Sequence, residues 1–216
     1  MANRERRIGA LVVLFGGAML GGCGNTFDSR SQMEWFDLAG LVDLDEHTVD
    51  AAWSQRGDGY VFSAGKPRAY ISLPYDLAGS YELLTRLTIE RSKETVRLLL
   101  PVADRYIQFD IKGDTGNTAA ETATMMLSGL TPERLTWSDD KIAIGEEYRY
   151  HFDIHVREPK CRIRIMVNDC LLYSWLGNLS DVNDGIRPER LRQSWIELET
   201  AYYTTAYFAE LAAMLK

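Results

Sequence analysis

Alternation of apolar and polar residues is the dominant pattern along the chain. It is clearest in residues 148–157, where apolar side chains fall at every second position and polar ones fall between them: Tyr148, Tyr150, Phe152, Ile154 and Val156 against Arg149, His151, Asp153, His155 and Arg157. Ten residues of strict alternation predict a β-strand with one buried and one solvated face.

The same period of two marks several other segments. Residues 163–167 and 170–175 flank Asn168-Asp169, which predicts a hairpin with a two-residue turn. Residues 81–90 and 107–111 also alternate, and shorter candidates lie at residues 59–63, 69–73, 96–100 and 195–199. So many short strands with one solvated face predict an all-β fold, an antiparallel β-sandwich of jelly-roll type.

Helical signal is scarce. Residues 38–44 predict one or two helical turns. Residues 201–216 carry two opposing signals, because Ala, Leu, Met and Glu favour a helix whereas Tyr202-Tyr203-Thr204-Thr205 and Tyr207-Phe208 favour a strand. We predict a strand that closes the sheet.

The N-terminus has the pattern of an export signal. Arg4, Arg6 and Arg7 precede a run of 13 uncharged, mostly apolar residues, 8–20, which is too short to span a ~30 Å hydrocarbon core. The following Leu20-Gly21-Gly22-Cys23 resembles the lipobox of bacterial lipoproteins. This resemblance implies cleavage before Cys23 and attachment of lipid to its thiol.

The expected organisation is therefore a signal peptide at residues 1–22, a lipidated Cys23 with a tether to residue 34, and one β-sandwich domain at residues 35–216. A multi-chain lipid anchor implies stable attachment in the cell envelope. Gly24 follows Cys23, where Asp would resemble an inner-membrane retention signal, so we expect the outer membrane if two membranes are present.

The net charge of the chain limits the classes of partner that we expect. The 216-residue chain has a net charge of −7, and removing residues 1–22, with three basic residues and one acidic, changes this to −9. Nucleic-acid binding needs a basic protein face, so we predict no nucleic-acid partner.

Several short motifs resemble the concanavalin A-like lectin/glucanase superfamily, particularly its laminin-G-like and 3-keto-disaccharide-hydrolase-related bacterial branches. They are Leu41-Val42-Asp43-Leu44-Asp45, Trp53-Ser54, Gly57-Asp58-Gly59, Leu73-Pro74-Tyr75, Tyr81-Glu82-Leu83, Ser128-Gly129-Leu130, residues 152–157 and Trp175-Leu176-Gly177. The resemblance implies a sandwich that binds or processes glycans. It also makes calcium possible, although we predict no cofactor from the residues themselves.

The chain departs from the catalytic pattern of these glucanases. They carry Glu-x-Asp-x-x-Glu on one strand, whereas this chain has only Glu197-x-Glu199. This departure favours a protein that binds glycans over one that cleaves them.

His151-x-Asp153-x-His155, flanked by Arg149, is the most site-like group because alternate residues of a strand point to the same side. These residues, with Trp137 from a polar stretch, are our candidate ligand-binding residues. The alternative is that the strand simply presents a solvated polar face. We predict no metal site, since the outer histidines lie about 13 Å apart at their Cα atoms.

The other two cysteines invite a disulfide in an exported protein, yet the predicted hairpin places Cys170 opposite Val167 and far from Cys161. We predict two unpaired thiols.

The leading hypothesis is an envelope lipoprotein with a lectin-like sandwich that binds a glycan or another ligand without catalysis. A second is a glycoside-processing enzyme that uses Asp110, Asp153 and Glu197. A third is a structural lipoprotein that docks other proteins.

Overall fold

The computed structural model describes residues 34–49, 53–57, 59–62, 68–92, 94–113, 122–130, 136–183, 194–201 and 204–216. The predicted signal peptide and Cys23 lie outside these residues. In the part of the chain described, no helix is long and apolar enough to cross a membrane.

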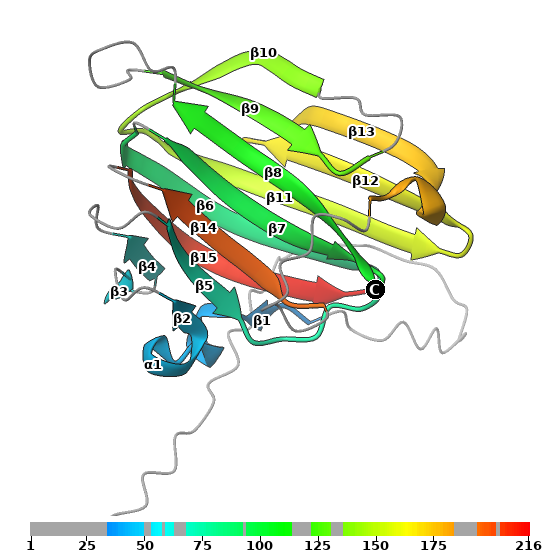
Figure 1. Cartoon of the computed structure of the whole chain (residues 1–216), viewed down its shortest axis with the longest axis horizontal. Coiled ribbons are helices and arrows are strands. Elements are labelled where there is room, and N and C mark those ends of the chain that lie inside the picture. Colours follow the sequence, from blue (N-terminus) through cyan, green and yellow to red (C-terminus); the bar gives the residue numbers. More distant parts are fainter. Residues whose placement is uncertain are drawn as a thin grey trace, which may run out of the picture. The chain divides into compact units, whose positions relative to one another are not determined.

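The described strands form two antiparallel sheets (Figure 1). Sheet A has the order β13 (Cys170–Asn178), β12 (Lys160–Val167), β11 (Glu147–Arg157), β6 (Tyr81–Arg91), β15 (Thr205–Leu215), β4 (Gly59–Phe62) and β3 (Trp53–Arg56), and β1 (Phe36–Asp37) also pairs with β15. Sheet B has the order β10 (Thr136–Ala143), β9 (Thr122–Ser128), β8 (Arg105–Gly113), β7 (Thr95–Val102), β14 (Ile196–Ala201), β5 (Arg68–Leu73) and β2 (Thr48–Val49). The predicted all-β sandwich is confirmed.

Helical structure is confined to short turns in the described residues: η1 (Ala39–Leu41), α1 (Leu44–His47) and η2 (Leu179–Asp181). The Asp43 side chain caps α1 by accepting a hydrogen bond from the Asp45 amide (2.9 Å).

The two sheets share one apolar core. Phe109 of β8 contacts Phe152 and Tyr150 of β11, with ring centroids 5.4 and 5.9 Å apart in edge-to-face geometry. Such aromatic pairs add about 0.5–1.5 kcal/mol beyond the burial of their area. Buried tyrosine hydroxyls also link the layers, as Tyr81 of β6 donates to the Pro101 carbonyl of β7 (3.0 Å).

The predicted closing strand is confirmed, and it lies inside sheet A between β6 and β4. Its pairing with β6 is irregular between Ala209 and Ala212, where Glu210 adopts a φ of 51°. Ala206 and Phe208 face the core before this bulge, and Leu211 and Ala213 face it afterwards. The extra residue shifts the alternation by one position, so that apolar residues continue to face the core after the bulge. The segment is a strand although its alanines favour a helix.

The β12–β13 hairpin is also as predicted. Asn168 and Asp169 both have positive φ, 48° and 65°, which suits a tight two-residue turn. Cys170 pairs with Val167 while Cys161 pairs with Gly177, and both thiols are free. Burial and the charge of Asp181 raise the pKa of the Cys161 thiol to about 11.

Five strands were not expected from the sequence: β1, β2, β3, β9 and β10. β10 contains Trp137 and the polar stretch that follows it, for which no strand was predicted. The strand pairs with β9 through a register shift between Trp137 and Lys141, and this irregularity explains why no regular alternation marks it.

Gly59 offers a test of the packing of β4 against β15. A Cβ atom at this position would overlap the backbone carbonyl of Phe208, whereas nothing lies within 4 Å of one at Gly79. We expect Gly59→Ala to lower the free energy of unfolding by roughly 1–3 kcal/mol, and Gly79→Ala to leave it nearly unchanged. Urea unfolding followed by tryptophan fluorescence measures both. Equal stability of the two variants would contradict this account.

Candidate functional site

The four polar residues predicted on β11 do share the outer face of sheet A. Arg149, His151, Asp153 and His155 alternate with Tyr150, Phe152 and Ile154, which are buried in the core. Trp137 lies on β10 in the other sheet, and its side chain is outside the described residues. The structure therefore does not place Trp137 in one sheet with the other four.

Ion pairs within sheet A hold the central members of this group. His151 Nε2 lies 2.6 Å from Glu82 Oε2, and the ammonium of Lys216 lies 2.6 Å from Glu82 Oε1 and 2.9 Å from Asp153 Oδ1. Arg162 donates from Nη2 to the other oxygen of Asp153 (3.2 Å). These contacts tie β6, β11 and β12 to Lys216. This arrangement matches the alternative of a polar strand face better than a preformed ligand site.

The surroundings of Asp153 set its pKa. Burial alone would raise it, but the hydrogen bond and charge of Lys216 and the charges of Arg162 and Arg164 lower the pKa below its usual value. The same pairing raises the pKa of Lys216, although burial acts in the opposite direction. Both shifts favour the charged forms.

A different polar group lies on the outer face of sheet B, at its centre. Arg97 comes from β7, Gln108 and Asp110 from β8, and Glu199 from β14; we call these four residues the Arg97 cluster. The register places Arg97 directly opposite Asp110 on one side and Glu199 on the other. Figure 1 shows these three strands next to each other in this sheet.

The guanidinium of Arg97 bridges two nearly buried carboxylates. It donates from Nε and Nη2 to Asp110 (2.7 and 3.3 Å) and from Nη1 to Glu199 (3.1 Å). Gln108 donates to the same Asp110 carboxylate (2.7 Å). The side chains of Asp110 and Glu199 are 5% and 8% exposed, and that of Arg97 is 24% exposed. The cluster is therefore a rigid, largely desolvated charge network with one accessible cation.

Hydrogen bonds and neighbouring charges favour the charged form of the Arg97 guanidinium. Burial lowers the pKa of Arg97, but its hydrogen bonds with Asp110 and Glu199 and their charges raise it overall. Removing one member of such a buried group typically costs about 3–5 kcal/mol, since it leaves an uncompensated charge.

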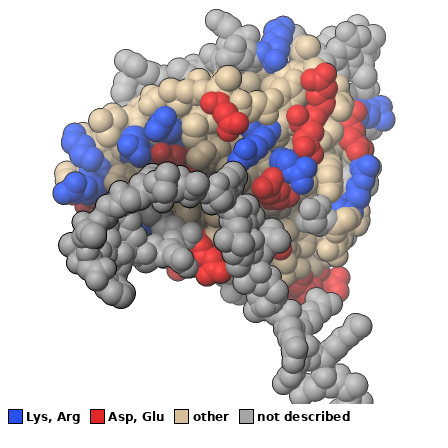
Figure 2. All heavy atoms as spheres, turned by 180° about the vertical axis from the view of Figure 1, so that it is seen from behind, with Lys and Arg blue, Asp and Glu red and all other residues tan. Residues whose placement is uncertain are grey.

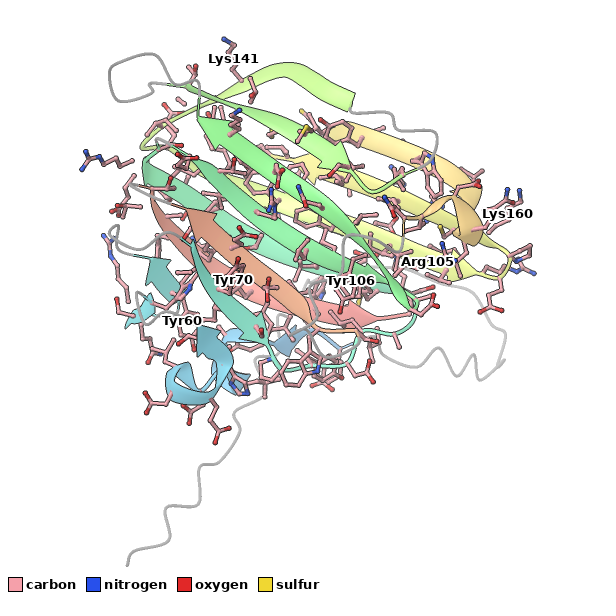
Figure 3. All side chains as sticks on the ribbon, in the orientation of Figure 1. Tyr60, Tyr70, Arg105, Tyr106, Lys141 and Lys160 are labelled. Carbon is pink, nitrogen blue, oxygen red and sulfur yellow. The ribbon has the colours of Figure 1, made fainter. Side chains whose placement is uncertain are left out.

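Other side chains of this face surround the cluster. Leu99 and Tyr106 form a separate small buried group, and their outward positions on β7 and β8 put them beside it. Glu197 precedes Glu199 by two residues on β14, so it points to the same side and is only 1% exposed. Tyr70 of β5 lies directly opposite Glu199, and Figure 3 labels it together with Tyr106. The face thus combines carboxylates, a guanidinium, an amide and aromatic rings.

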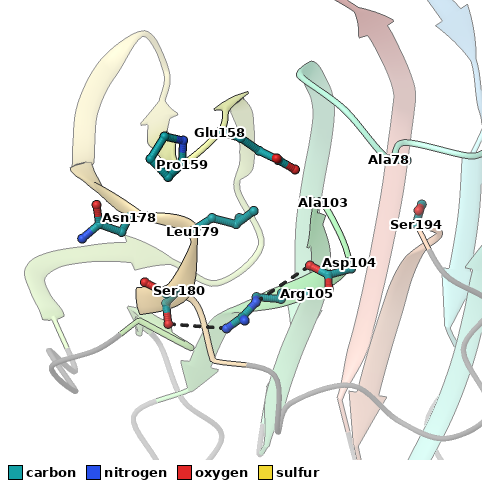
Figure 4. A pocket seen from close by; sticks show the side chains of 10 residues that line it. All are labelled: Ala78, Ala103, Asp104, Arg105, Glu158, Pro159, Asn178, Leu179, Ser180 and Ser194. Atoms are coloured by element: carbon teal, nitrogen blue, oxygen red, sulfur yellow. Dashed lines mark hydrogen bonds and ion pairs between the residues drawn. The ribbon is translucent and has the colours of Figure 1, made fainter.

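An open hollow of about 820 Å³ lies at one end of the domain, lined by the β7–β8 turn, the β11–β12 turn and η2 (Figure 4). Arg105 lines it, but this side chain donates to the backbone carbonyls of Val182 and Ser180 (2.5 and 3.4 Å). Its guanidinium therefore serves mainly to hold the backbone of residues 180–182 in place. The hollow holds no network comparable with the Arg97 cluster among the described residues.

Sequence reasoning found Asp110 and Glu197 as possible catalytic groups but joined them with Asp153, which lies on the opposite sheet. It missed Arg97 and Gln108 altogether. The available signal was one Arg between the core residues Val96 and Leu98. In the described ranges, no group of three or more His, Cys, Asp or Glu side chains is arranged to hold a metal ion.

Comparisons with known proteins give fold likeness only. No protein-family model matches the chain, and neither does any curated protein sequence. Similar solved structures include a legume lectin-like domain from Entamoeba histolytica, with 12% identity, a TM-score of 0.45 and coverage of 79% of this chain and 89% of that one. Another is a beta-glucanase of Bacillus licheniformis, with 8% identity, a TM-score of 0.45 and coverage of 77% and 83%.

The ionisation of Asp153 predicts a defined pH dependence. Because its pKa is lowered on folding, the stabilisation is present above the unfolded value of ~3.9 and is lost as the pH falls through the lower folded value. Asp153→Asn should reduce the free energy of unfolding by about 1–3 kcal/mol at pH 7, and the difference from wild type should shrink below about pH 4. Urea unfolding across this range measures it.

The exposed Asp169 provides the matched control. It lies 3.9 Å from Arg149 and its side chain is 82% exposed, so Asp169→Asn should change stability little at any pH. A constant difference between wild type and Asp153→Asn down to pH 2 would contradict the assignment.

Proposed function

We propose that the protein is a lipid-anchored component of the bacterial cell envelope whose sandwich binds a glycan on the outer face of sheet B. The Arg97 cluster is the observation that carries the proposal. A sheet face that served only solubility would expose its charges, whereas this one keeps two carboxylates desolvated at its centre.

The chemistry of the cluster suits hydroxyl-rich ligands. Three of the five guanidinium N–H groups of Arg97 bond to carboxylates, and the other two have no partner among the described residues. Half-buried Gln108 and Ser72 lie on the same face and add donors and acceptors. Fixed polar groups of both kinds match the hydroxyls of a sugar, which both donate and accept hydrogen bonds.

Glycoside processing is a second candidate, favoured by Glu197 and Glu199. Residues two apart on a strand have Cα atoms about 6.6 Å apart and point to the same side. This spacing agrees with the carboxyl separations of about 5–9.5 Å used in glycoside hydrolysis. Asp153 has no place in this candidate, since it lies on the other sheet.

A glycan-array screen of the full-length protein in detergent tests the binding function. We expect wild type to bind a defined set of oligosaccharides. Arg97→Lys, which keeps the charge between the two carboxylates but removes the spare N–H groups, and Gln108→Ala should each weaken binding at least about tenfold, a difference of ~1.4 kcal/mol. Arg91→Lys, at an exposed position on β6 of the opposite sheet, should bind as wild type does. Product analysis on each bound glycan separates binding from hydrolysis.

Two results would count against the site. One is the absence of any hit for wild type, and the other is a hit that both sheet B variants bind normally. Unfolding midpoints measured in parallel show whether a variant has lost its fold rather than its ligand contacts.

The anchor is tested separately by mass spectrometry of the protein isolated from its host membrane. We expect an N-terminal peptide that begins at Cys23 and carries a diacylglyceryl group. The Cys23→Ala variant should lack the modification and leave the membrane fraction, because one apolar segment of 13 residues does not span a bilayer. An unmodified Cys23 in the membrane-bound wild type would contradict the proposal.

A further inference from the structure

A group of basic side chains lies at one end of the outer face of sheet A. Arg157 ends β11, and Lys160, Arg162 and Arg164 follow on β12; we call these four residues the basic strip. They point outward because the residues between them on β12, Cys161 and Ile163, are buried in the core. Figure 2, which views this side of the molecule, shows basic side chains gathered near one margin.

The strand period arranges these charges in a line. Alternate residues of a strand lie about 6.6 Å apart, so Lys160, Arg162 and Arg164 extend over roughly 13 Å along β12. In the strand register, Arg157 lies directly opposite Lys160, His155 opposite Arg162, and Asp153 opposite Arg164. Like charges directly opposite each other destabilise a strand pair. Arg157 and Lys160, at the end of the β11–β12 hairpin, therefore repel each other, and a bound anion would reduce this repulsion.

Most of this charge is not neutralised within the protein. No carboxylate of the described residues lies within ion-pair distance of Arg157 or Arg164, and Lys160 donates only to the neutral Asn178 side chain (2.7 Å). Arg162 reaches Asp153, which Lys216 already neutralises, and its Nε is buried without a hydrogen-bond partner. An acidic residue, Glu158, lies between Arg157 and Lys160 in the sequence, in the turn between β11 and β12.

The remainder of the same face is different. Arg86 pairs with both Glu147 and Glu210, and Arg56 pairs with Glu90. Figure 2 shows acidic and basic side chains interleaved there. The chain as a whole has a net charge of −7. On this face, a row of basic side chains that mostly lack a carboxylate partner is therefore a local feature of the basic strip.

The shape of the basic strip favours a narrow ligand. A bilayer lying against this face would also meet the acidic side chains of Glu82, Glu147 and Glu210. A chain lying along β12 meets mainly the basic strip, because Asp153 beside it is 8% exposed and already pairs with Arg162 and Lys216. Guanidinium groups bind carboxylates through paired hydrogen bonds, which adds geometric selectivity to charge. At physiological ionic strength the Debye length is about 8 Å, so the local strip outweighs the net negative charge of the molecule.

We propose that the basic strip binds an acidic glycan chain that bears uronate carboxylates and lies along β12. This site is on the sheet opposite the Arg97 cluster, and it stands independently of the function proposed for that cluster.

Calorimetric titration of the full-length protein in detergent with oligogalacturonate tests the proposal, and the fully methyl-esterified oligosaccharide is the matched uncharged ligand. Wild type should bind the free acid at least tenfold more tightly than the ester, and its affinity should fall as salt is added. The double variant Arg157→Gln/Arg164→Gln should lose at least tenfold in affinity for the acid. Arg91→Gln, which changes an exposed arginine at the end of β6 outside the basic strip, should bind as wild type does.

Equal affinity of wild type for the acid and the ester would overturn the proposal, and so would unchanged binding by a folded double variant. Binding of wild type to vesicles of phosphatidylglycerol and phosphatidylcholine, without binding to oligogalacturonate, would assign the basic strip to a lipid surface instead. The comparison of acid with ester uses wild type alone, so it decides the matter even if the double variant is unstable. Failure of the Arg97 variants in the glycan screen leaves these results unaffected.

Discussion

Burial of every second residue of the long strands in a core common to both sheets is the constraint on which the structure depends. Phe109 of sheet B packs against Tyr150 and Phe152 of sheet A, and these contacts commit the intervening positions to the two outer faces. Because the side-chain period of a strand is two, a register slip of one residue would exchange core and surface throughout. The polar residues of β7, β8 and β11 are therefore placed by the apolar residues between them.

The two outer faces use their charges in different ways. On sheet A, Lys216, Glu82, Asp153 and His151 form ion pairs between neighbouring strands, and these pairs help to hold β15 and its following residue against β6 and β11. On sheet B, the Arg97 cluster is nearly desolvated and lies at the sheet centre. Both networks contain nearly buried carboxylates, Asp153 on sheet A and Asp110 with Glu199 on sheet B, and each is retained at a desolvation cost. On sheet A these charges pair with one another, whereas Arg97 keeps two N–H groups without a partner among the described residues. For this reason we propose ligand binding on sheet B and a largely structural role for the centre of sheet A.

More of the fold than of the candidate site could be predicted from the sequence. Strict alternation located β11 and the β12–β13 hairpin, since both depend on neighbouring residues alone. β10 escaped prediction because its irregular pairing interrupts the period of two. The closing strand β15 was predicted from its tyrosines and phenylalanine, but the bulge at Glu210 that lets it change the face of its core residues is visible only in three dimensions.

The candidate site depends on contacts between distant positions, and these are not encoded in local patterns. Arg97 meets Asp110 across a hairpin but reaches Glu199 from 102 positions away. Conversely, His151 and Asp153 resemble a site in the sequence, yet Glu82 and Lys216, 69 and 63 positions away, take up their polar atoms. The sequence identified chemically capable residues on both faces, and strand register decided which of them act together.

A crystal structure of the protein with an oligosaccharide bound to sheet B is the most direct test of the central claim. The account predicts that a sugar oxygen lies about 2.7–3.2 Å from the guanidinium of Arg97, while the guanidinium keeps its bonds to Asp110 and Glu199. A bound oligosaccharide that makes all its contacts elsewhere, with no sugar atom near the Arg97 cluster, would contradict it.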